Sequence, residues 1–418
     1  MIRIIKGNII STSVFGQMDI IKNGYLVYSE ERINGVYSTL PEKYKNLAID
    51  DYHDALVMQA FSDMHLHAPQ YPMLGMGMDL PLLDWLNRYT YKTESRFSDL
   101  DYARSVYHEL ARKLIQYGTT RVCMFSSLHT DATLILMEEL EKAGICGYVG
   151  KVSMDINSPD YYCETTEKSK SETIRWLDSC ARFKNINPMI TPRFTISCSR
   201  ELMKWLGTIA DERSLPIQSH LSENNKEIKQ VLENHPDCQQ YWQTYAKSKL
   251  WNSRTLMAHC VYSDSYEREA MRKAGVYTVH CADSNMNIAS GIAPVRKLLN
   301  EGNKVVLGSD IAGGASLSML DAIQMTIRAS KVYSIASNWE VPYLTVAEAY
   351  YLGTSAANEF FGEKPGFSEG NTLHAVVIDD TKFLNTKELS LNERFERSVY
   401  LAKPDDIIAV YSNGKRVK

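Results

Sequence analysis

A strongly apolar run that begins at Ala55 ends in the segment Phe61-Ser62-Asp63-Met64-His65-Leu66-His67-Ala68-Pro69-Gln70. Only Gln59 interrupts this run, which predicts a buried strand. Side chains two residues apart on a strand share a face, so we expect His65 and His67 to point the same way. Neutral imidazoles are good ligands for zinc or iron, and the pair would supply half of a metal site. The alternative is two surface histidines in a loop.

The middle of the chain alternates between strand-like and helix-like segments. Each strand-like run is followed by a polar–apolar segment with helical spacing, as in 131–143, which ends before Gly144, and 264–274, which ends before Gly275. Repeated strand-then-helix units over roughly 300 residues predict a (β/α)8 barrel. A doubly wound open sheet is the alternative, but no glycine-rich phosphate loop follows the first strand. The strand-like runs are 55–67, 119–126, 145–153, 188–194, 215–219, 254–258, 276–281 and 304–309.

Both ends of the chain are rich in strand-like segments and turns. Near the start these are 2–10 and 24–28, with a hairpin signal at Asn34-Gly35. Near the end they are 372–378 and 407–411, with another such signal at Asn413-Gly414. The predicted fold is therefore α/β: a distorted (β/α)8 barrel over residues 61–362, with a small β-sandwich domain formed by residues 1–60 and 363–418.

The composition is typical of a soluble globular protein. Hydrophobic residues make up 44% and charged residues 23% of the chain, and the formal net charge is -4. Nothing in this balance favours nucleic acid or an anionic membrane as a partner. No apolar segment approaches the roughly 20 residues that span a bilayer, and the start has no signal-peptide core. The dispersed cysteines form no C-x-x-C pair, which suits reduced thiols, and we expect a cytoplasmic protein.

Barrel enzymes place their reactive groups at the C-terminal ends of the strands. Several histidines and one aspartate fall at these predicted ends, and their joint occurrence favours a single site over unrelated core or rim residues. Asp310 on its own could equally cap the next helix. The residues at the predicted strand ends are His65, His67, Arg193, Phe194, His220, Glu223, His259, His280 and Asp310.

Three histidines and the aspartate together predict a metal site. They could hold one divalent ion with a position left for water, which makes a crowded, five-coordinate site. The ion would lower the pKa of that water towards neutrality. No lysine lies at the end of the fourth strand to bridge a second ion, so we expect one. The predicted ligands are His65, His67, His220 and Asp310.

Two further residues have predicted roles in proton transfer and polarisation. Glu223 lies three residues beyond His220, close enough to reach the water and to carry protons from it to a substrate. A carboxylate favoured by the dipole at a helix N-terminus is the alternative explanation of Glu223. His259 would polarise the attacked group or steady the bound water.

These motifs resemble the amidohydrolase superfamily, and within it the branch of enzymes that deaminate guanine. The resemblance rests on the H-x-H pair, on Gln218-Ser219-His220, Ala258-His259 and Gly308-Ser309-Asp310, and it covers nearly the whole chain. More specific stretches are His67-Ala68-Pro69-Gln70-Tyr71, Asp79-Leu80-Pro81-Leu82-Leu83-Asp84-Trp85-Leu86, Thr191-Pro192-Arg193-Phe194, Gln218-Ser219-His220-Leu221-Ser222-Glu223-Asn224 and Ser318-Met319-Leu320-Asp321-Ala322.

The resemblance implies a hydrolase that converts guanine and water to xanthine and ammonia in purine catabolism. It implies one zinc ion on the four ligands above (iron is the alternative), Glu223 as the proton shuttle with catalytic help from Asp310, and a homodimer. Gln70, Arg193 and Phe194 would hold the purine with His259 facing it, and Trp85 would line the pocket. For Arg193 the alternative is a solvated surface charge, and for Phe194 and Trp85 it is core packing.

Two other functions remain open at this point. The same hydrolytic groups could act on another aminopurine, a pterin, cytosine or a triazine. A catalytically inactive relative that serves as a scaffold is a possibility of another class, although loss of metal ligands would be its expected mark. Whether Asp283 and Asn285 touch the substrate or brace their loop is also open.

Overall fold

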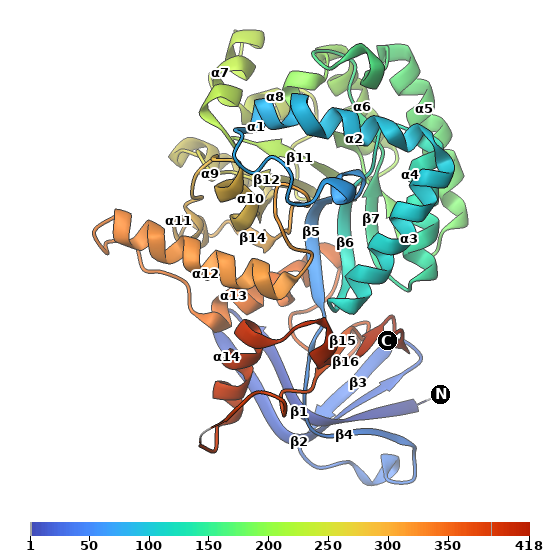
Figure 1. Ribbon diagram of the computed structural model, residues 1–418, viewed down its shortest axis with the longest axis vertical. Coiled ribbons are helices and arrows are strands. Elements are labelled where there is room, and N and C mark those ends of the chain that lie inside the picture. Colours follow the sequence, from blue (N-terminus) through green and yellow to red (C-terminus); the bar gives the residue numbers. More distant parts are fainter. Residues whose placement is uncertain (1, 386) are drawn as a thin grey trace.

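The computed structural model describes residues 2–385 and 387–418. Figure 1 shows an upper part in which helices surround a set of mostly parallel strands, and a lower part that is a β-sheet. The lower sheet contains strands from both ends of the chain. This arrangement confirms the predicted fold class, whereas the domain boundaries stay a prediction.

The strands of the upper part follow one another around a barrel. Ladders join β5-β6-β7-β9, β10-β8 and β11-β12-β13-β14, and a bridge between Ile190 and Ile217 continues the series. The segment after β14 then returns to β5, because Asp310 N donates to His65 O at 2.8 Å and His67 N donates to Ile311 O at 2.9 Å. The strands are β5 Phe61–His67, β6 Thr119–Phe125, β7 Cys146–Gly150, β8 Val152–Ser153, β9 Ile186–Pro188, β10 Thr191–Pro192, β11 Ile217–Leu221, β12 Thr255–His259, β13 Tyr277–His280 and β14 Lys304–Leu307.

Helices cover the outside of this barrel (Figure 1). Their boundaries follow local signals, as in α9, where the Asp264 side chain accepts a hydrogen bond from Glu267 N and Gly275 ends the helix with φ 72°. The helices are α1 Leu82–Trp85, α2 Tyr91–Ser95, α3 Leu100–Gln116, α4 Thr130–Lys142, α5 Thr166–Ser179, α6 Arg200–Glu212, α7 Asn225–Asn234, α8 Trp242–Ala246, α9 Ser265–Ala274, α10 Ala282–Asn287, α11 Val295–Asn300, α12 Met319–Ala336 and α13 Val346–Gly353.

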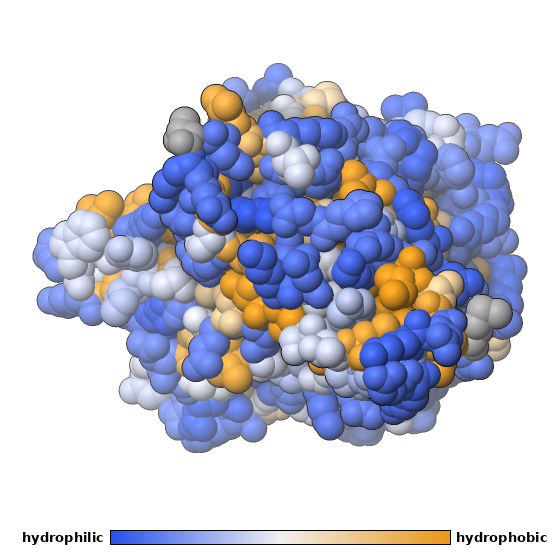
Figure 2. Space-filling view, turned by 90° about the horizontal axis from the view of Figure 1, so that it is seen from below, coloured by the Kyte–Doolittle hydropathy of each residue, from blue (hydrophilic) through white to orange (hydrophobic). Residues whose placement is uncertain are grey.

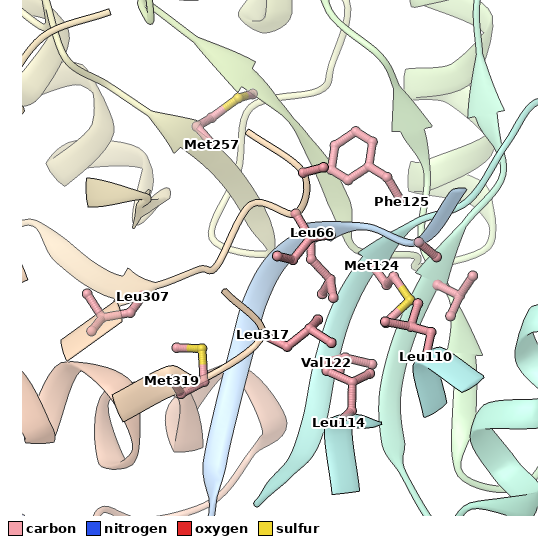
Figure 3. Close-up of a cluster of buried hydrophobic side chains, with 14 of the residues drawn as sticks. Leu66, Leu110, Leu114, Val122, Met124, Phe125, Met257, Leu307, Leu317 and Met319 are labelled. Carbon is pink, nitrogen blue, oxygen red and sulfur yellow. The ribbon is translucent and has the colours of Figure 1, made fainter. Parts of the chain in front are cut away.

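The layer between α3 and the barrel shows how the helices are attached. Leu110 and Leu114 lie one helical turn apart on α3 and face the same way. Figure 3 shows them beside Val122 and Met124, two residues apart on β6 and therefore on its outer face. All four side chains are fully buried, and each such burial stabilises the fold by about 1.5–3 kcal/mol. This packing attaches α3 to β6, the strand next to β5.

The lower sheet has the order β17-β16-β15-β4-β1-β2-β3 and encloses a core of its own. It curls until its β3 edge meets the segment before β15, where Ile33 N donates to Asn371 O at 2.9 Å and Leu373 N donates to Glu31 O at 2.7 Å. The expected sandwich is thus one curled sheet. Its elements are β1 Ile2–Val14, β2 Gln17–Ser29, β3 Arg32–Tyr37, β4 Ile49–Gln59, β15 Ala375–Ile378, β16 Ile407–Ser412 and β17 Lys415–Arg416, with α14 Leu391–Leu401 beside them.

The apolar run 55–67 is two strands rather than the one predicted. Ala60 separates β4, which belongs to the lower sheet, from β5, which belongs to the barrel. The backbone partner changes at this residue: Ala60 N donates to His374 O, and Phe61 N donates to Gly118 O. Both strands are buried: Leu56 and Met58 of β4 share the large core with β5, while Val57 packs in the core of the lower sheet. Their hydrophobic pattern is therefore continuous although their sheets differ.

One of the two predicted hairpins is wrong. The turn between β2 and β3 lies at Glu30 and Glu31, and Asn34-Gly35 lies inside β3 where the pairing register shifts. Gly35 has φ 149°, so this dipeptide accommodates a bulge and not a turn. The prediction at Asn413-Gly414 is confirmed, because both residues have positive φ and connect β16 to β17.

The helices of the described residues show no sign of a membrane-spanning segment. None of the helices in residues 2–385 and 387–418 is long and apolar enough to cross a bilayer. Figure 2, seen from below the lower sheet, shows hydrophobic side chains scattered between hydrophilic ones. The cysteines are free thiols, as their spacing predicts.

A glycine in α6 gives a test of the packing. A Cβ added at Gly207 would overlap the carbonyl oxygen of Ser248, which is backbone and has no room to move. We therefore expect Gly207→Ala to lower the free energy of unfolding by about 2–3 kcal/mol, although alanine favours helix over glycine by about 1 kcal/mol. Thermal unfolding measures the change, with Lys204→Ala on the exposed face of α6 as control. A Gly207→Ala variant as stable as the control would contradict this packing.

Candidate active site

A pocket lies at the C-terminal ends of the barrel strands, where the predicted residues were expected. About 410 Å³ of space lies between the lining atoms, part of it open to solvent. Polar side chains line one part of it and apolar side chains the other. The lining residues are His67, Gln70, Leu82, Trp85, Leu86, Arg193, Phe194, His220, Glu223, His259, Ile288 and Asp310.

Three histidines from two strands and one aspartate converge at the bottom of this pocket. The His67 and His220 Nε2 atoms are 3.2 Å apart, and Asp310 Oδ1 lies 3.3 Å from His65 Nε2 and 3.6 Å from His67 Nε2. The His65 and His67 ring centroids are 5.0 Å apart, so the two side chains lie on one side of β5. His65, His67 and Asp310 are more than nine-tenths buried, and His220 is partly buried.

His259 extends the same cluster. Its Nε2 lies 3.8 Å from Asp310 Oδ2 and 3.4 Å from Glu223 Oε2. His259 and Asp310 both have positive φ, 75° and 50°, a backbone conformation that non-glycine residues rarely adopt. Such strained positions are typical of functional sites.

Burial and neighbouring charges set the protonation states. Burial lowers the pKa of His65, and it lowers those of His67 and His220 well below the usual range, so these rings are neutral. Burial opposes ionisation of Asp310, but the surrounding histidines outweigh it and hold its pKa well below the usual range. Neutral imidazoles with an ionised carboxylate are the forms that bind a metal cation.

Neighbouring hydrogen bonds orient the rings. His220 Nδ1–H donates to the Arg193 carbonyl oxygen at 2.5 Å, and His259 Nδ1–H donates to Asn285 Oδ1 at 2.8 Å. Each bond turns the opposite nitrogen, Nε2, toward the pocket. Ser284 Oγ donates to Asp310 Oδ2 from the other side. Sequence reasoning did not identify Ser284, because a serine on a short helix carries no distinguishing pattern.

The donor set fits a metal ion. The ligand atoms of His65, His67 and His220 lie within 4.8 Å of one another, and so do those of His65, His259 and Asp310. Among the described residues, His65 Nε2 is buried without a hydrogen-bond partner. A buried nitrogen lone pair without a partner is costly, and a cation would satisfy it. Imidazole nitrogens with one carboxylate oxygen are typical of zinc and iron sites.

Glu223 lies beside this cluster with an unusual acidity. Burial is the main cause that raises its pKa to about 7, with the nearby Glu227 and Asp310 carboxylates adding to the effect. Ser290 Oγ donates to Glu223 Oε1 at 3.0 Å, leaving Oε2 to face His259. A carboxyl group with a pKa near 7 exchanges its proton readily at neutral pH.

Arg193 and Gln70 occupy the polar wall, and a residue that the sequence did not reveal joins them. Glu94, on α2, is fully buried. It accepts hydrogen bonds from Arg193 Nη1 at 2.6 Å, Arg193 Nη2 at 3.0 Å and Gln70 Nε2 at 2.8 Å. Glu94 lies between β5 and α3, in a stretch where one acidic residue among several polar ones gives no signal. Arg193 is therefore buried, and the surface-charge alternative is wrong.

The remaining predicted residues divide into walls and supports. Phe194 and Trp85 line the pocket, and Trp85 Nε1 donates to Met76 O at 2.9 Å. Asp283 accepts a hydrogen bond from Ala315 N at 2.7 Å and so braces its loop. Asn285 supports His259, as described above. His280 ends β13 but is not among the pocket-lining residues.

A barrel with a histidine- and aspartate-rich site at its strand ends defines a class of hydrolases, and the sequence places the chain within it. Residues 56–417 match the model of the amidohydrolase family. The match spans most of the chain, so this protein belongs to the amidohydrolase family.

Several of the proteins similar to this chain are guanine deaminases. The chain is 33% identical to guanine deaminase of Dictyostelium discoideum over 100% of this chain and 98% of that protein. It is 38% identical to guanine deaminase of Rattus norvegicus over 87% and 83% of the two chains. A crystal structure of guanine deaminase from C. acetobutylicum with bound guanine in the active site superposes with a TM-score of 0.98, at 41% identity over all of both chains.

The cluster predicts how metal content responds to substitution. We expect the purified protein to bind about one equivalent of a divalent ion, and His67→Ala or His220→Ala to weaken that binding at least about tenfold. Elemental analysis after dialysis against a chelator measures it, and His108→Ala, whose ring is largely exposed on α3, is the matched control. Equal metal retention in all three variants would show that the ion binds elsewhere.

Proposed function

We propose that this protein is a metal-dependent aminohydrolase that converts guanine and water to xanthine and ammonia. The observation that carries the proposal is the shared pocket of Glu223, His259 and Asp310 with the Arg193–Gln70 wall. The similarity to guanine deaminases over the full length of the chain also supports it. The alternative function is the same reaction on another aminated ring. It is supported by the metal-binding cluster alone and gives no role to the Arg193–Gln70 wall.

We assign the metal to His65, His67, His220 and Asp310, and take it to be one zinc ion, with iron as the alternative. When bound, such an ion lowers the pKa of a coordinated water and makes it a better nucleophile. The homodimer and the cytoplasmic location stay predictions. The presence of every expected ligand argues against an inactive scaffold.

Glu223 moves the protons in this proposal. Water adds to C2 of the ring, Glu223 takes a proton from it and delivers that proton to a ring nitrogen. The C2–amino bond then breaks, and the amino group leaves as ammonia after receiving the second proton of the water. The elevated pKa of about 7 suits a group that must both accept and donate near neutral pH.

His259 and Asp310 stabilise the changing charge around C2. Burial lowers the pKa of His259, but Glu223 and Asp310 outweigh burial and raise it above the usual range. A protonated His259 donates from Nε2 toward the pocket, because its Nδ1–H already donates a hydrogen bond to Asn285 Oδ1. Asp310 accepts from Ser284, and its other oxygen faces the histidines, where it can help the ammonia to leave.

The polar wall explains why guanine fits. Its carbonyl oxygen and ring nitrogens form a pattern of acceptors that a guanidinium reads with two parallel hydrogen bonds. Arg193 supplies the guanidinium and Gln70 an amide with both a donor and an acceptor. Phe194, Trp85 and neighbouring aliphatic side chains cover the flat faces of the ring.

A substrate panel tests the assignment. We expect metal-loaded protein to release ammonia from guanine at a kcat/KM at least about a hundredfold above that for adenine, cytosine, a pterin or a triazine. Adenine and a triazine lack a carbonyl oxygen beside a ring nitrogen, cytosine carries that pair directly next to its amino group, and the two six-membered rings of a pterin are larger than a purine. Ammonia release and xanthine absorbance measure the two products. No turnover of guanine, with turnover of another ring, would reject this substrate.

Replacing the proton carrier tests the mechanism. Glu223→Gln preserves shape but cannot accept a proton, so we expect kcat to fall at least about a thousandfold, since the residue handles both proton transfers. Metal content should be unchanged, because Glu223 is not an assigned ligand. Glu227→Gln, a buried carboxyl of α7 that caps the backbone behind Glu223, serves as comparison. Retained activity in Glu223→Gln would rule out the shuttle role.

A further inference from the structure

A buried carboxylate stands behind the polar wall of the pocket. Glu94 holds Arg193 through both terminal nitrogens and Gln70 through its amide nitrogen, and all three side chains are at least nine-tenths buried. Glu94 does not line the pocket. It acts through two residues that do.

The first consequence concerns the orientation of Gln70. A carboxylate only accepts hydrogen bonds, so the amide atom facing Glu94 must be Nε2 and the other must be Oε1. Gln70 Oε1 accepts from Ala312 N at 3.1 Å, which agrees with this orientation. Glu94 thus fixes which end of the amide is donor and which is acceptor before a ligand enters.

The second consequence concerns the guanidinium. Glu94 accepts one hydrogen bond from each terminal nitrogen of Arg193. A guanidinium has five N–H donors in a planar fork, so Nε–H and an outer Nη–H still form a second two-donor edge. That edge matches a carbonyl oxygen beside a ring nitrogen, which is what a purine such as guanine offers.

The third consequence is electrical. Arg193 and Glu94 form a buried ion pair, 2.6 Å between Nη1 and Oε2, and together carry no net charge. Burial opposes the charge on Arg193, but Glu94 holds its pKa above the usual range. The phenols beside the pair are neutral, because burial raises the pKa values of Tyr91 on α2, Tyr107 on α3 and Tyr162.

We propose that Glu94 is a positioning residue that determines specificity: it presets the donors of Arg193 and Gln70 and neutralises the wall, so that the pocket prefers a neutral ring to an anionic one. This inference rests on the proposed function. Xanthine, the product, is a stronger acid than guanine and is partly anionic near neutral pH. A wall without net positive charge does not retain that anion, which favours its release.

Glu94→Gln tests this, because glutamine keeps the shape but leaves the Arg193 charge without a partner. Steady-state assays give kcat and KM for guanine and the inhibition constant of xanthine, below and above the pKa of xanthine. We expect KM to rise about tenfold or more while kcat changes less. Above that pKa, we expect the ratio of the xanthine inhibition constant to the guanine KM to fall at least about tenfold relative to wild type.

Glu164→Gln is the matched control. Glu164 pairs with Lys151 at 2.8 Å, is equally buried and lies outside the pocket. We expect Glu164→Gln to leave the guanine KM unchanged, and also the ratio of the xanthine inhibition constant to that KM. Wild-type values of KM and of the ratio in Glu94→Gln, or a loss in kcat alone, would overturn the role of Glu94 while the guanine activity of the wild type stands. A wild type without guanine activity would overturn both proposals.

A double variant covers the case in which Glu94→Gln does not fold. Removing both partners of a buried ion pair is far less destabilising than removing one, so Arg193→Met combined with Glu94→Gln restores a neutral wall. A neutral wall does not favour the xanthine anion, so above the pKa of xanthine we expect the ratio of the xanthine inhibition constant to the guanine KM in this double variant to stay within about threefold of wild type. A fall of that ratio by about tenfold or more would contradict the proposal.

Discussion

The site depends on the contact between β5 and the segment that follows β14. Two backbone hydrogen bonds join them, from Asp310 N to His65 O and from His67 N to Ile311 O. The approach is so close that a Cβ on Gly308 would meet the His65 backbone at 2.9–3.0 Å. His65 and Asp310, more than two hundred positions apart in the sequence, are thereby brought to 3.3 Å, and His220 of β11 completes the proposed ligand set.

Around that contact, the charged groups of the pocket lie in separate regions that have different roles. At the bottom, burial keeps the His67 and His220 rings neutral while the Asp310 carboxylate stays ionised. At the wall, Arg193 and Glu94 cancel each other. Glu223 lies between the two regions with a pKa of about 7, the only pocket-lining carboxyl group whose proton is available near neutral pH. The geometry thus separates cation binding, proton transfer and ring recognition.

Sequence patterns predicted the strand-end histidines and Asp310 because their signal is local: each follows a short apolar run. They failed where the deciding contact is distant. Hydrophobicity alone predicts one strand through Ala60, because it does not show which sheet a buried strand joins. Asn34-Gly35 predicts a turn, although a glycine with positive φ also accommodates a bulge. Glu94 was missed because its importance comes only from its partners.

The central claim is that one cation is held by imidazoles of β5 and β11 together with Asp310. X-ray absorption spectroscopy of the metal-loaded protein tests it most directly. The account predicts a single first shell of imidazole nitrogens and carboxylate or water oxygens at about 2.0–2.2 Å, with a Glu223→Gln variant giving the same spectrum. A thiolate shell at about 2.3 Å, or a metal–metal distance of about 3.5–4 Å, would contradict it.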